Sequence, residues 1–217
     1  MAISVVVAVG GVADPLVEAI TKRIPSVVIG PGDDPESQMG PLVTAQHRER
    51  VRAYIDGAEA EGARLVVDGR TGQTDAAPAD GFFLGCTLLD EVRPGMRAYD
   101  DEIFGPVLSV ARVPTYEAAV ELVNASPYGN GTAIFTRDGG AARRFQREVS
   151  AGMVGVNVAI PVPVGFHSFG GWKSSLFGDS AMYGPEGIRF YTRPKVVTTR
   201  WPDPSTSEID LGFPRTR

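Results

Sequence analysis

The segment Glu102 to Pro106 places an acid and an aromatic residue two positions apart, just before Gly-Pro. A carboxylate such as that of Glu102 can accept two hydrogen bonds from a ribose diol, while a ring such as that of Phe104 can pack on a flat base. At strand-like spacing the two side chains share one face. The pair therefore suits a nucleotide. The alternative is an exposed acid beside a core phenylalanine, and the residues alone favour neither interpretation.

Three other side chains could serve acid-base or nucleophilic chemistry, but each has a structural explanation. Cys86 lies between apolar residues, which raise the pKa of a thiol, so we expect it to be buried and inert. His47 lies among charged residues of a predicted helix and is expected on the solvated surface. His167 lies in the Gly- and Pro-rich stretch 161–171 without an identified acid partner. The sequence predicts no catalytic triad.

The sequence has no self-contained nucleotide or metal motif. Gly10 and Gly11 follow an apolar run but lack the G-x-G-x-x-G spacing that brings backbone amides to a pyrophosphate. No Walker sequence, G-x-S-x-G elbow or metal-spaced His/Cys cluster occurs. Lys and Arg number 21 against 26 Asp and Glu, and this net charge of -5 argues against nucleic acid as a partner.

The chain of 217 residues, 43% of them hydrophobic, predicts one compact body, and its 26 Gly and 17 Pro exclude a pure helical bundle. The single cysteine cannot form an internal disulfide, which fits a reducing compartment. No Lys or Arg precedes Lys22, so the apolar start lacks the charged region of a secretory leader. No apolar run reaches the ~18 residues of a membrane helix. We expect a soluble, cytoplasmic protein that does not bind a membrane.

The first half of the chain reads as strands and helices in alternation. Residues 3–9 (ISVVVAV) form a run rich in β-branched residues, typical of a parallel strand that is covered on both faces and has neighbours on both sides. Asp14 and Thr44 are predicted to cap helices, the second of which ends at Gly62. Residues 64–68 and the apolar stretch 81–89 follow.

The second half predicts a βαβαβ arrangement. Strand-like segments 106–113, 132–136 and 153–158 alternate with helices that Thr115 and Asp138 are expected to cap. Residues 187–201 are rich in aromatic and β-branched residues, but Pro194 confines them to a sheet edge or a bulge. Another subunit could pair with such an edge strand. The tail from residue 202 has little to bury and is expected to fray.

Four segments together resemble the C-terminal half of an aldehyde dehydrogenase: EIFGPV at 102–107, SPYGNGTAIFT at 126–136, GVNVAIPVPV at 155–164 and SFGGWKSS at 168–175. The forms NVAIPVPV and GIRFYTRPKVVTTRW resemble the CoA-acylating methylmalonate-semialdehyde dehydrogenase branch, and the similarity runs from Met1 to about Trp201. SFGGWKSS is nearer the general aldehyde dehydrogenase pattern.

This resemblance implies an α/β fold with a parallel sheet flanked by helices. It implies a catalytic domain over residues 1–186, an oligomerisation strand over 187–201 and a flexible tail over 202–217. Because Met1 to Ser4 resemble the residues that follow the family's nucleophilic cysteine, that cysteine, the oxyanion-hole asparagine and the N-terminal NAD-binding Rossmann domain are expected to be absent from this chain.

The resemblance also implies roles for individual residues. Glu102 matches the acid that binds the nicotinamide ribose, and Phe104 matches the ring that positions the nicotinamide. Phe169 matches an aromatic residue of the substrate funnel and Asn157 a strand asparagine beside it. The same entrance would be lined by His167 and Ser168.

The implied reaction is the NAD-dependent oxidation of methylmalonate or malonate semialdehyde to propanoyl-CoA or acetyl-CoA, with coenzyme A as co-substrate. Ser180 stands where hydrolytic family members carry a second glutamate, which agrees with acyl release to a thiol. We expect the isolated chain to be inactive and to form a homo-oligomer, or a hetero-oligomer with a dehydrogenase. The alternatives are a non-catalytic remnant or a split subunit that pairs with a full-length aldehyde dehydrogenase.

Overall fold

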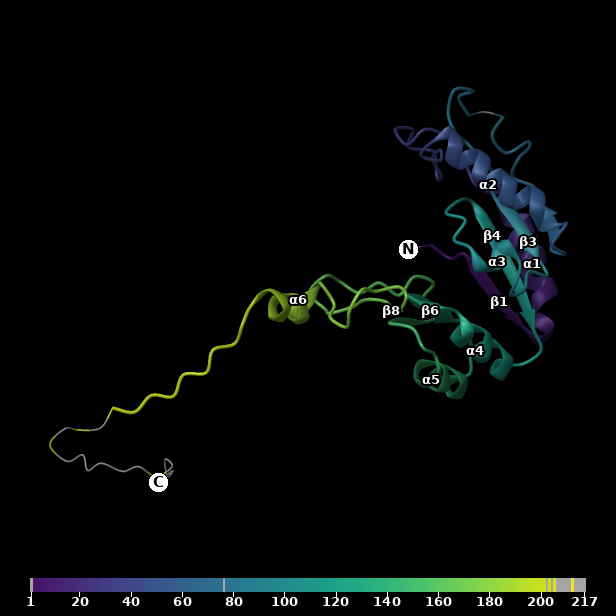
Figure 1. Ribbon diagram of the computed structural model, residues 1–217. Coiled ribbons are helices and arrows are strands. Elements are labelled where there is room, and N and C mark those ends of the chain that lie inside the picture. The colour runs from purple at the N-terminus through teal and green to yellow at the C-terminus, as the bar shows by residue number, and fades with distance from the viewer. Residues whose placement is uncertain (1, 76, 202, 204, 206–211, 213–217) are drawn as a thin grey trace.

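The computed structural model describes residues 2–75, 77–201, 203, 205 and 212. Its centre is a four-stranded sheet in the order β1-β4-β3-β2 (Figure 1). β1, β4 and β3 are parallel, whereas β2 is antiparallel to β3. The strands are β1 (Val5–Val9), β2 (Arg64–Val67), β3 (Thr87–Asp90) and β4 (Val107–Val113). The predicted α/β fold with a parallel sheet is confirmed.

Apolar side chains are buried on both faces of this sheet, because successive residues of a strand point to opposite sides. Leu88 and Leu89 of β3 are both fully buried. Leu88 belongs to the cluster with α1 (Ala13–Arg23), and Leu89 to the cluster with α2 (Ala45–Ala58) and α3 (Arg97–Asp100). Short 3-10 helices, Gly10–Val12 and Ile24–Ser26, flank α1.

The first strand, β1, has fewer neighbouring strands than predicted. We expected neighbours on both sides of residues 3–9, but among the described residues β1 pairs only with β4 and lies at the edge of the sheet. Its burial is accordingly incomplete: only Ala8 of the five strand residues is buried. One edge of the most β-branched segment therefore carries no partner strand in the described part of the chain.

Most predicted helix caps are confirmed. The side chains of Thr44, Thr115 and Asp138 accept backbone N–H groups at the starts of α2, α4 (Tyr116–Ala125) and α5 (Gly139–Glu148). The predicted cap at Asp14 is wrong: α1 begins at Ala13, so Asp14 lies inside its first turn, and the side chain pairs with Arg112. α2 ends at Ala58 and not at Gly62.

The predicted βαβαβ unit is divided between sheets. β6 (Gly131–Ile134) and β7 (Met153–Val156) pair with each other in parallel, while β4 belongs to the large sheet. The reason is that β1 and β3 occupy both edges of β4, so β6 has no free edge there. A further antiparallel pair, β5 (Tyr128–Gly129) with β8 (Trp172–Lys173), lies beside this unit.

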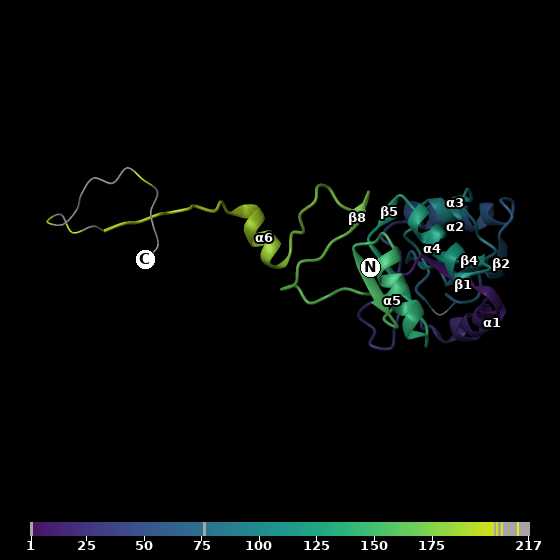
Figure 2. The same cartoon turned by 90° about the horizontal axis from the view of Figure 1, so that it is seen from below.

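The expected edge strand at 187–201 is wrong in its first part, where the chain forms α6 (Gly184–Tyr191). Pro185 at the first turn presets a helical φ, and the acid Glu186 complements the positive end of the helix. Residues 192–201 are extended and pair with no described strand. Figures 1 and 2 show α6 and this segment leading away from the sheet. The expected fraying of 202–217 lies almost entirely outside the described residues.

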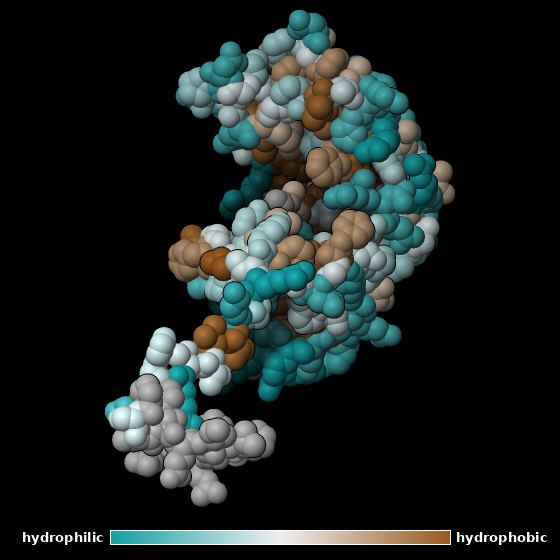
Figure 3. Space-filling model, turned by 60° about the vertical axis from the view of Figure 1, so that its left-hand side comes forward, coloured by the Kyte–Doolittle hydropathy of each residue, from teal (hydrophilic) through white to brown (hydrophobic). Residues whose placement is uncertain are grey.

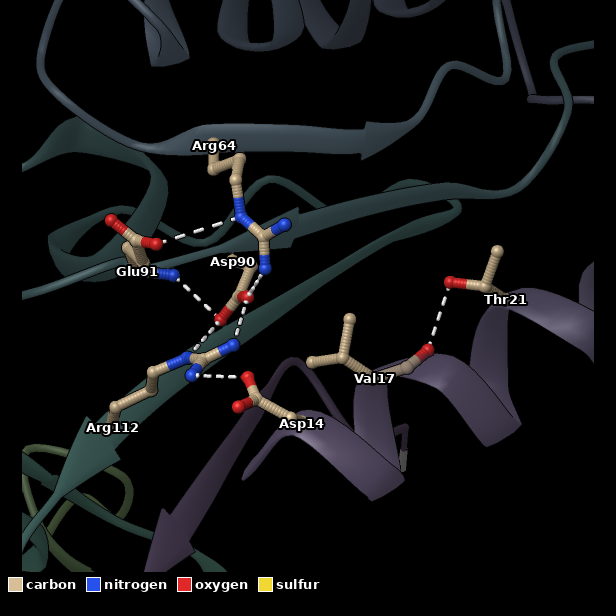
Figure 4. Close-up of polar contacts among 7 residues, drawn as sticks. All are labelled: Asp14, Val17, Thr21, Arg64, Asp90, Glu91 and Arg112. Atoms are coloured by element: carbon tan, nitrogen blue, oxygen red, sulfur yellow. Dashed lines mark hydrogen bonds and ion pairs between the residues drawn. The ribbon is translucent and has the colours of Figure 1, made fainter. Parts of the chain in front are cut away.

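A buried carboxylate links three strands to α1 (Figure 4). Asp90 of β3 accepts hydrogen bonds from Arg112 of β4 at 2.9 and 2.6 Å, from Arg64 of β2 and from the backbone N–H of Glu91. Arg112 also reaches Asp14, at 2.7 Å. Burial by itself raises the pKa of Asp90, but the hydrogen bonds from Arg112 and Arg64 outweigh it and lower that pKa to about 2.

Candidate functional site

The turn between α3 and β4 presents the acid and the ring that the sequence singled out. Ile103 is buried in the core beneath α2, whereas Glu102 and Phe104 on either side of it are exposed, Phe104 by 71%. The predicted strand-like geometry is wrong, because β4 begins only at Val107 and Phe104 has a φ of 57°. The pair is therefore presented by a turn and not by a strand face.

The left-handed backbone at Phe104 costs of order 1–2 kcal/mol for a residue other than glycine, so its neighbours must impose it. Gly105 lies so close to α2 that a Cβ there would be 2.7 Å from Cγ2 of Val51. On the next residue, the carbonyl of Pro106 accepts the backbone N–H of Thr87 at 2.8 Å. The turn is thus packed between α2 and the start of β3, which makes it a rigid support for an exposed ring.

His47 lies at this turn, contrary to the expectation of a solvated surface histidine. Its Nε2 is 2.7 Å from the carbonyl oxygen of Phe104, and the two rings meet edge to face with centroids 6.4 Å apart. The helix that carries His47 is fixed by its Thr44 cap and by Val51, which is fully buried. No local pattern indicates this contact, because 57 residues separate the two partners along the chain.

Asn157 lies just after β7 with a left-handed φ of 56°, and its amide is engaged with the backbone. Its Oδ1 accepts the N–H of Thr136 at 2.9 Å, and its Nδ2 donates to the carbonyl of the same residue at 3.1 Å. The side chain therefore ties the end of β7 to the end of β6. Its predicted place beside a substrate funnel stays a prediction.

The predicted entrance residues 167–169 lie against the start of α6. The hydroxyl of Ser168 accepts the backbone N–H of Glu186 at 3.2 Å, and the ring of Phe169 stacks on Tyr183 at 4.7 Å between centroids. His167 is exposed and packs against the ring of Phe166. Sequence reasoning missed Tyr183; the signal that could have found it is Gly-Pro-Glu at 184–186, a pattern typical of a helix start.

The predicted residues thus lie in two parts of the chain, 102–104 and 157–169, and within the second part Asn157 bonds Thr136 while residues 168 and 169 contact the start of α6. No hydrogen bond, ion pair or ring contact joins the turn at 102–104 to Asn157 or to residues 167–169 within the described part of the chain. Figure 3 shows a hollow on one face of the molecule with apolar residues at its walls. Large apolar side chains are exposed throughout residues 158–201, among them Phe166, Phe177 and Trp201.

Cys86 lies in the predicted apolar setting, but it is half-buried and not fully buried. It packs between the sheet and α1, and burial raises the pKa of its thiol. Its backbone N–H and carbonyl are both bound by the side chain of Gln73, at 2.9 and 3.0 Å. A thiol held in its protonated form is a poor nucleophile, so this environment does not suit covalent catalysis.

Comparison with known proteins identifies the family of this chain. The profile described as "Aldehyde dehydrogenase family" matches residues 1–197. The malonate-semialdehyde dehydrogenase of Pseudomonas aeruginosa is 56% identical over 99% of this chain and 43% of its own length. A methylmalonate-semialdehyde dehydrogenase structure from Oceanimonas doudoroffii shares 52% identity with a TM-score of 0.87. A relative from Sinorhizobium meliloti 1021, solved with NAD, shares 50% with a TM-score of 0.88.

Both solved relatives match 93% of this chain but only 41% of their own, so the chain spans less than half their length. Within its described residues, no helix has the length and apolar character to cross a membrane. The matched region includes both exposed groups, the turn at 102–104 and the segment 157–169. On this match and these identities, the chain belongs to the aldehyde dehydrogenase family.

Proposed function

We propose that this chain supplies the nicotinamide-ribose contacts and the aldehyde entrance for an NAD-dependent, CoA-acylating oxidation of methylmalonate or malonate semialdehyde to propanoyl-CoA or acetyl-CoA. The observation that carries the proposal is the pair Glu102 and Phe104, both exposed on a turn whose strained backbone is fixed from two sides. Strain held in place by surrounding structure is a property of binding and catalytic sites.

The residues of the turn fit the nicotinamide end of the coenzyme. The Glu102 carboxylate is exposed and makes no ion pair within the described residues, so both of its oxygens are available for two hydroxyl donors. The Phe104 ring is 71% exposed and offers a flat apolar surface for an aromatic base. When bound, NAD would accept a hydride from the aldehyde carbon. This chain's own contribution is to orient the ring that accepts it.

The rest of the proposal rests on residues 157–180 and on the named relatives. Phe169 and its stacking partner Tyr183 form an aromatic wall next to Ser168, suited to an entrance for a small aldehyde. Ser180 is exposed, and a neutral hydroxyl is a weak general base for water, which favours a thiol such as coenzyme A as the acyl acceptor. We assign no covalent step to Cys86.

Nicotinamide mononucleotide provides a direct test, because it contains only the part of NAD that the turn would contact. We expect saturation-transfer NMR to detect binding to the 217-residue chain. Glu102→Gln should weaken that binding about tenfold, the size of one lost charge-assisted hydrogen bond, and Phe104→Ala by at least as much. The matched control is Asp101→Asn, an adjacent exposed acid that bonds Tyr54. Equal affinity in the parent and Glu102→Gln would contradict the proposal.

The exposed apolar residues of 158–201 favour a second function: pairing with a full-length aldehyde dehydrogenase without catalysis by this chain. We expect the purified chain to co-elute with the 56% identical Pseudomonas aeruginosa enzyme in size-exclusion chromatography. Replacing Val197 and Trp201, exposed by 71% and 91%, with serine should abolish co-elution. Separate elution at micromolar concentrations of both proteins would exclude this function.

A further inference from the structure

His47 and Val51 are four residues apart on α2 and therefore share one face of the helix. Both touch the turn that carries Phe104. Val51 fills the space beside Gly105, while His47 Nε2 bonds the carbonyl oxygen of Phe104 at 2.7 Å. A carbonyl only accepts hydrogen bonds, so Nε2 must carry the proton in this contact. The peptide group between residues 104 and 105 is thus held at both ends by one helix.

This hydrogen bond restrains a residue whose backbone conformation is unfavourable. Phe104 has a φ of 57°, and without outside support an aromatic residue would relax to negative φ. Such a change requires the peptide groups beside Phe104 to rotate. Ile103 on one side is buried and Gly105 on the other is packed on Val51. The hydrogen bond from His47 restrains the peptide group between residues 104 and 105 directly.

We infer that His47 is a positioning residue for the coenzyme site: it holds the Phe104 backbone in its left-handed form and so fixes the ring toward the nicotinamide. The inference rests on the proposed function of Glu102 and Phe104. His47 does not need to touch the coenzyme, because its Nε2 is already used by the Phe104 carbonyl. The edge-to-face contact of the two rings adds a second restraint on the same side chain.

Selective labelling can observe this contact without any ligand. The sequence contains three Phe-Gly pairs, at 104–105, 169–170 and 177–178. A chain with carbonyl-¹³C phenylalanine and ¹⁵N glycine therefore gives three cross-peaks in an HNCO spectrum. We expect His47→Ala to shift the peak of the 104–105 pair and to leave the other two unchanged. His47→Gln, whose amide can donate from a similar position, should restore most of the shift.

Nicotinamide mononucleotide titrations on the same variants test the functional half. We expect His47→Ala to weaken binding about fivefold, the equivalent of one net hydrogen bond, and His47→Gln to bind nearly as the parent does. Gln46→Ala, a change at the adjacent exposed position of α2, is the matched control and should leave both readouts unchanged. Thermal melts of all variants check that α2 remains folded.

The two readouts separate the possible outcomes. An unmoved 104–105 peak in His47→Ala overturns the inference. A shifted peak with unchanged nucleotide affinity also overturns it, because the contact would then be structural only. If the parent binds no nicotinamide mononucleotide, the proposed function fails, and the peak still decides whether His47 holds the Phe104 backbone.

Discussion

Replacing Asp90 with asparagine is expected to lower the free energy of unfolding by about 3–5 kcal/mol, the range for removing one partner of a buried ion pair. The Asp90 carboxylate is fully buried and bound by Arg112, Arg64 and the N–H of Glu91. Asparagine keeps the shape but loses the charge, so both guanidinium groups lose their buried counter-charge and keep only exposed ones, Asp14 for Arg112 and Glu91 for Arg64. Urea unfolding at pH 7, followed by circular dichroism, measures the difference.

The difference in stability between the parent chain and Asp90→Asn should depend on pH. Folding lowers the pKa of Asp90 from 3.8 to about 2. A group whose pKa is lowered by folding stabilises the fold above its unfolded value, and this stabilisation is lost as the pH falls through its folded value. By linkage, this lowering of the Asp90 pKa contributes about 2 kcal/mol to the free energy of unfolding. The difference between parent and Asp90→Asn should be constant from pH 7 to about 5 and shrink between about pH 4 and 2.

Asp14→Asn is the control for this prediction, because Asp14 contacts the same Arg112 from the surface. Its side chain is 84% exposed, and ion pairs of that kind contribute at most about 1 kcal/mol. Asp14→Asn should therefore cost little at pH 7. Equal losses in Asp14→Asn and Asp90→Asn would show that burial of Asp90 does not decide the energetics of the network.

The second large effect is expected at Gly152, where two stretches of backbone cross. A Cβ on Gly152 would lie 1.9 Å from the carbonyl oxygen of Gly170, and neither backbone can yield easily because Gly152 also donates its N–H to Gly129. Gly152→Ala should cost about 3 kcal/mol, at the upper end for overpacking, and lower the melting temperature by about 6–12 °C. Differential scanning calorimetry measures this directly.

Gly165→Ala is the matched control, since no atom lies within 4 Å of a Cβ at that position in the neighbouring loop. It should leave the melting temperature nearly unchanged. Because Gly170 follows Phe169, Gly152→Ala should also shift the labelled 169–170 cross-peak, and Gly165→Ala should shift it less. Similar melting temperatures for the two alanine variants would mean that the segment around Gly170 can move away without cost.

Helix starts were predictable because a cap acts over a few residues. Thr44, Thr115 and Asp138 each accept an N–H from within three positions along the chain. The cap predicted at Asp14 failed because the short 3-10 helix at Gly10–Val12 leads directly into α1, which begins at Ala13. Asp14 therefore lies inside the first turn, where its side chain cannot be the cap, and it pairs with Arg112 instead.

The sequence alone could not decide whether Phe104 is exposed beside Glu102 or buried in the core. The decision came from Ile103, which takes the buried position between them, and from α2, which occupies the space beside Gly105. The contact of His47 with the Phe104 carbonyl could not be predicted. A polar residue among charged neighbours is expected on the surface, and only the fold brings that carbonyl next to it.

The α/β class, three of the four helix caps, the family resemblance and the apolar setting of Cys86 could be predicted from the chain alone, because each depends on neighbours along the sequence. Three features became visible only in the folded chain: the split of the predicted βαβαβ unit, the helix α6 in place of an edge strand, and the hydrogen bond from His47 to Phe104. These features depend on which edges and carbonyls are free once the sheet has formed, and that is a property of packing between distant segments.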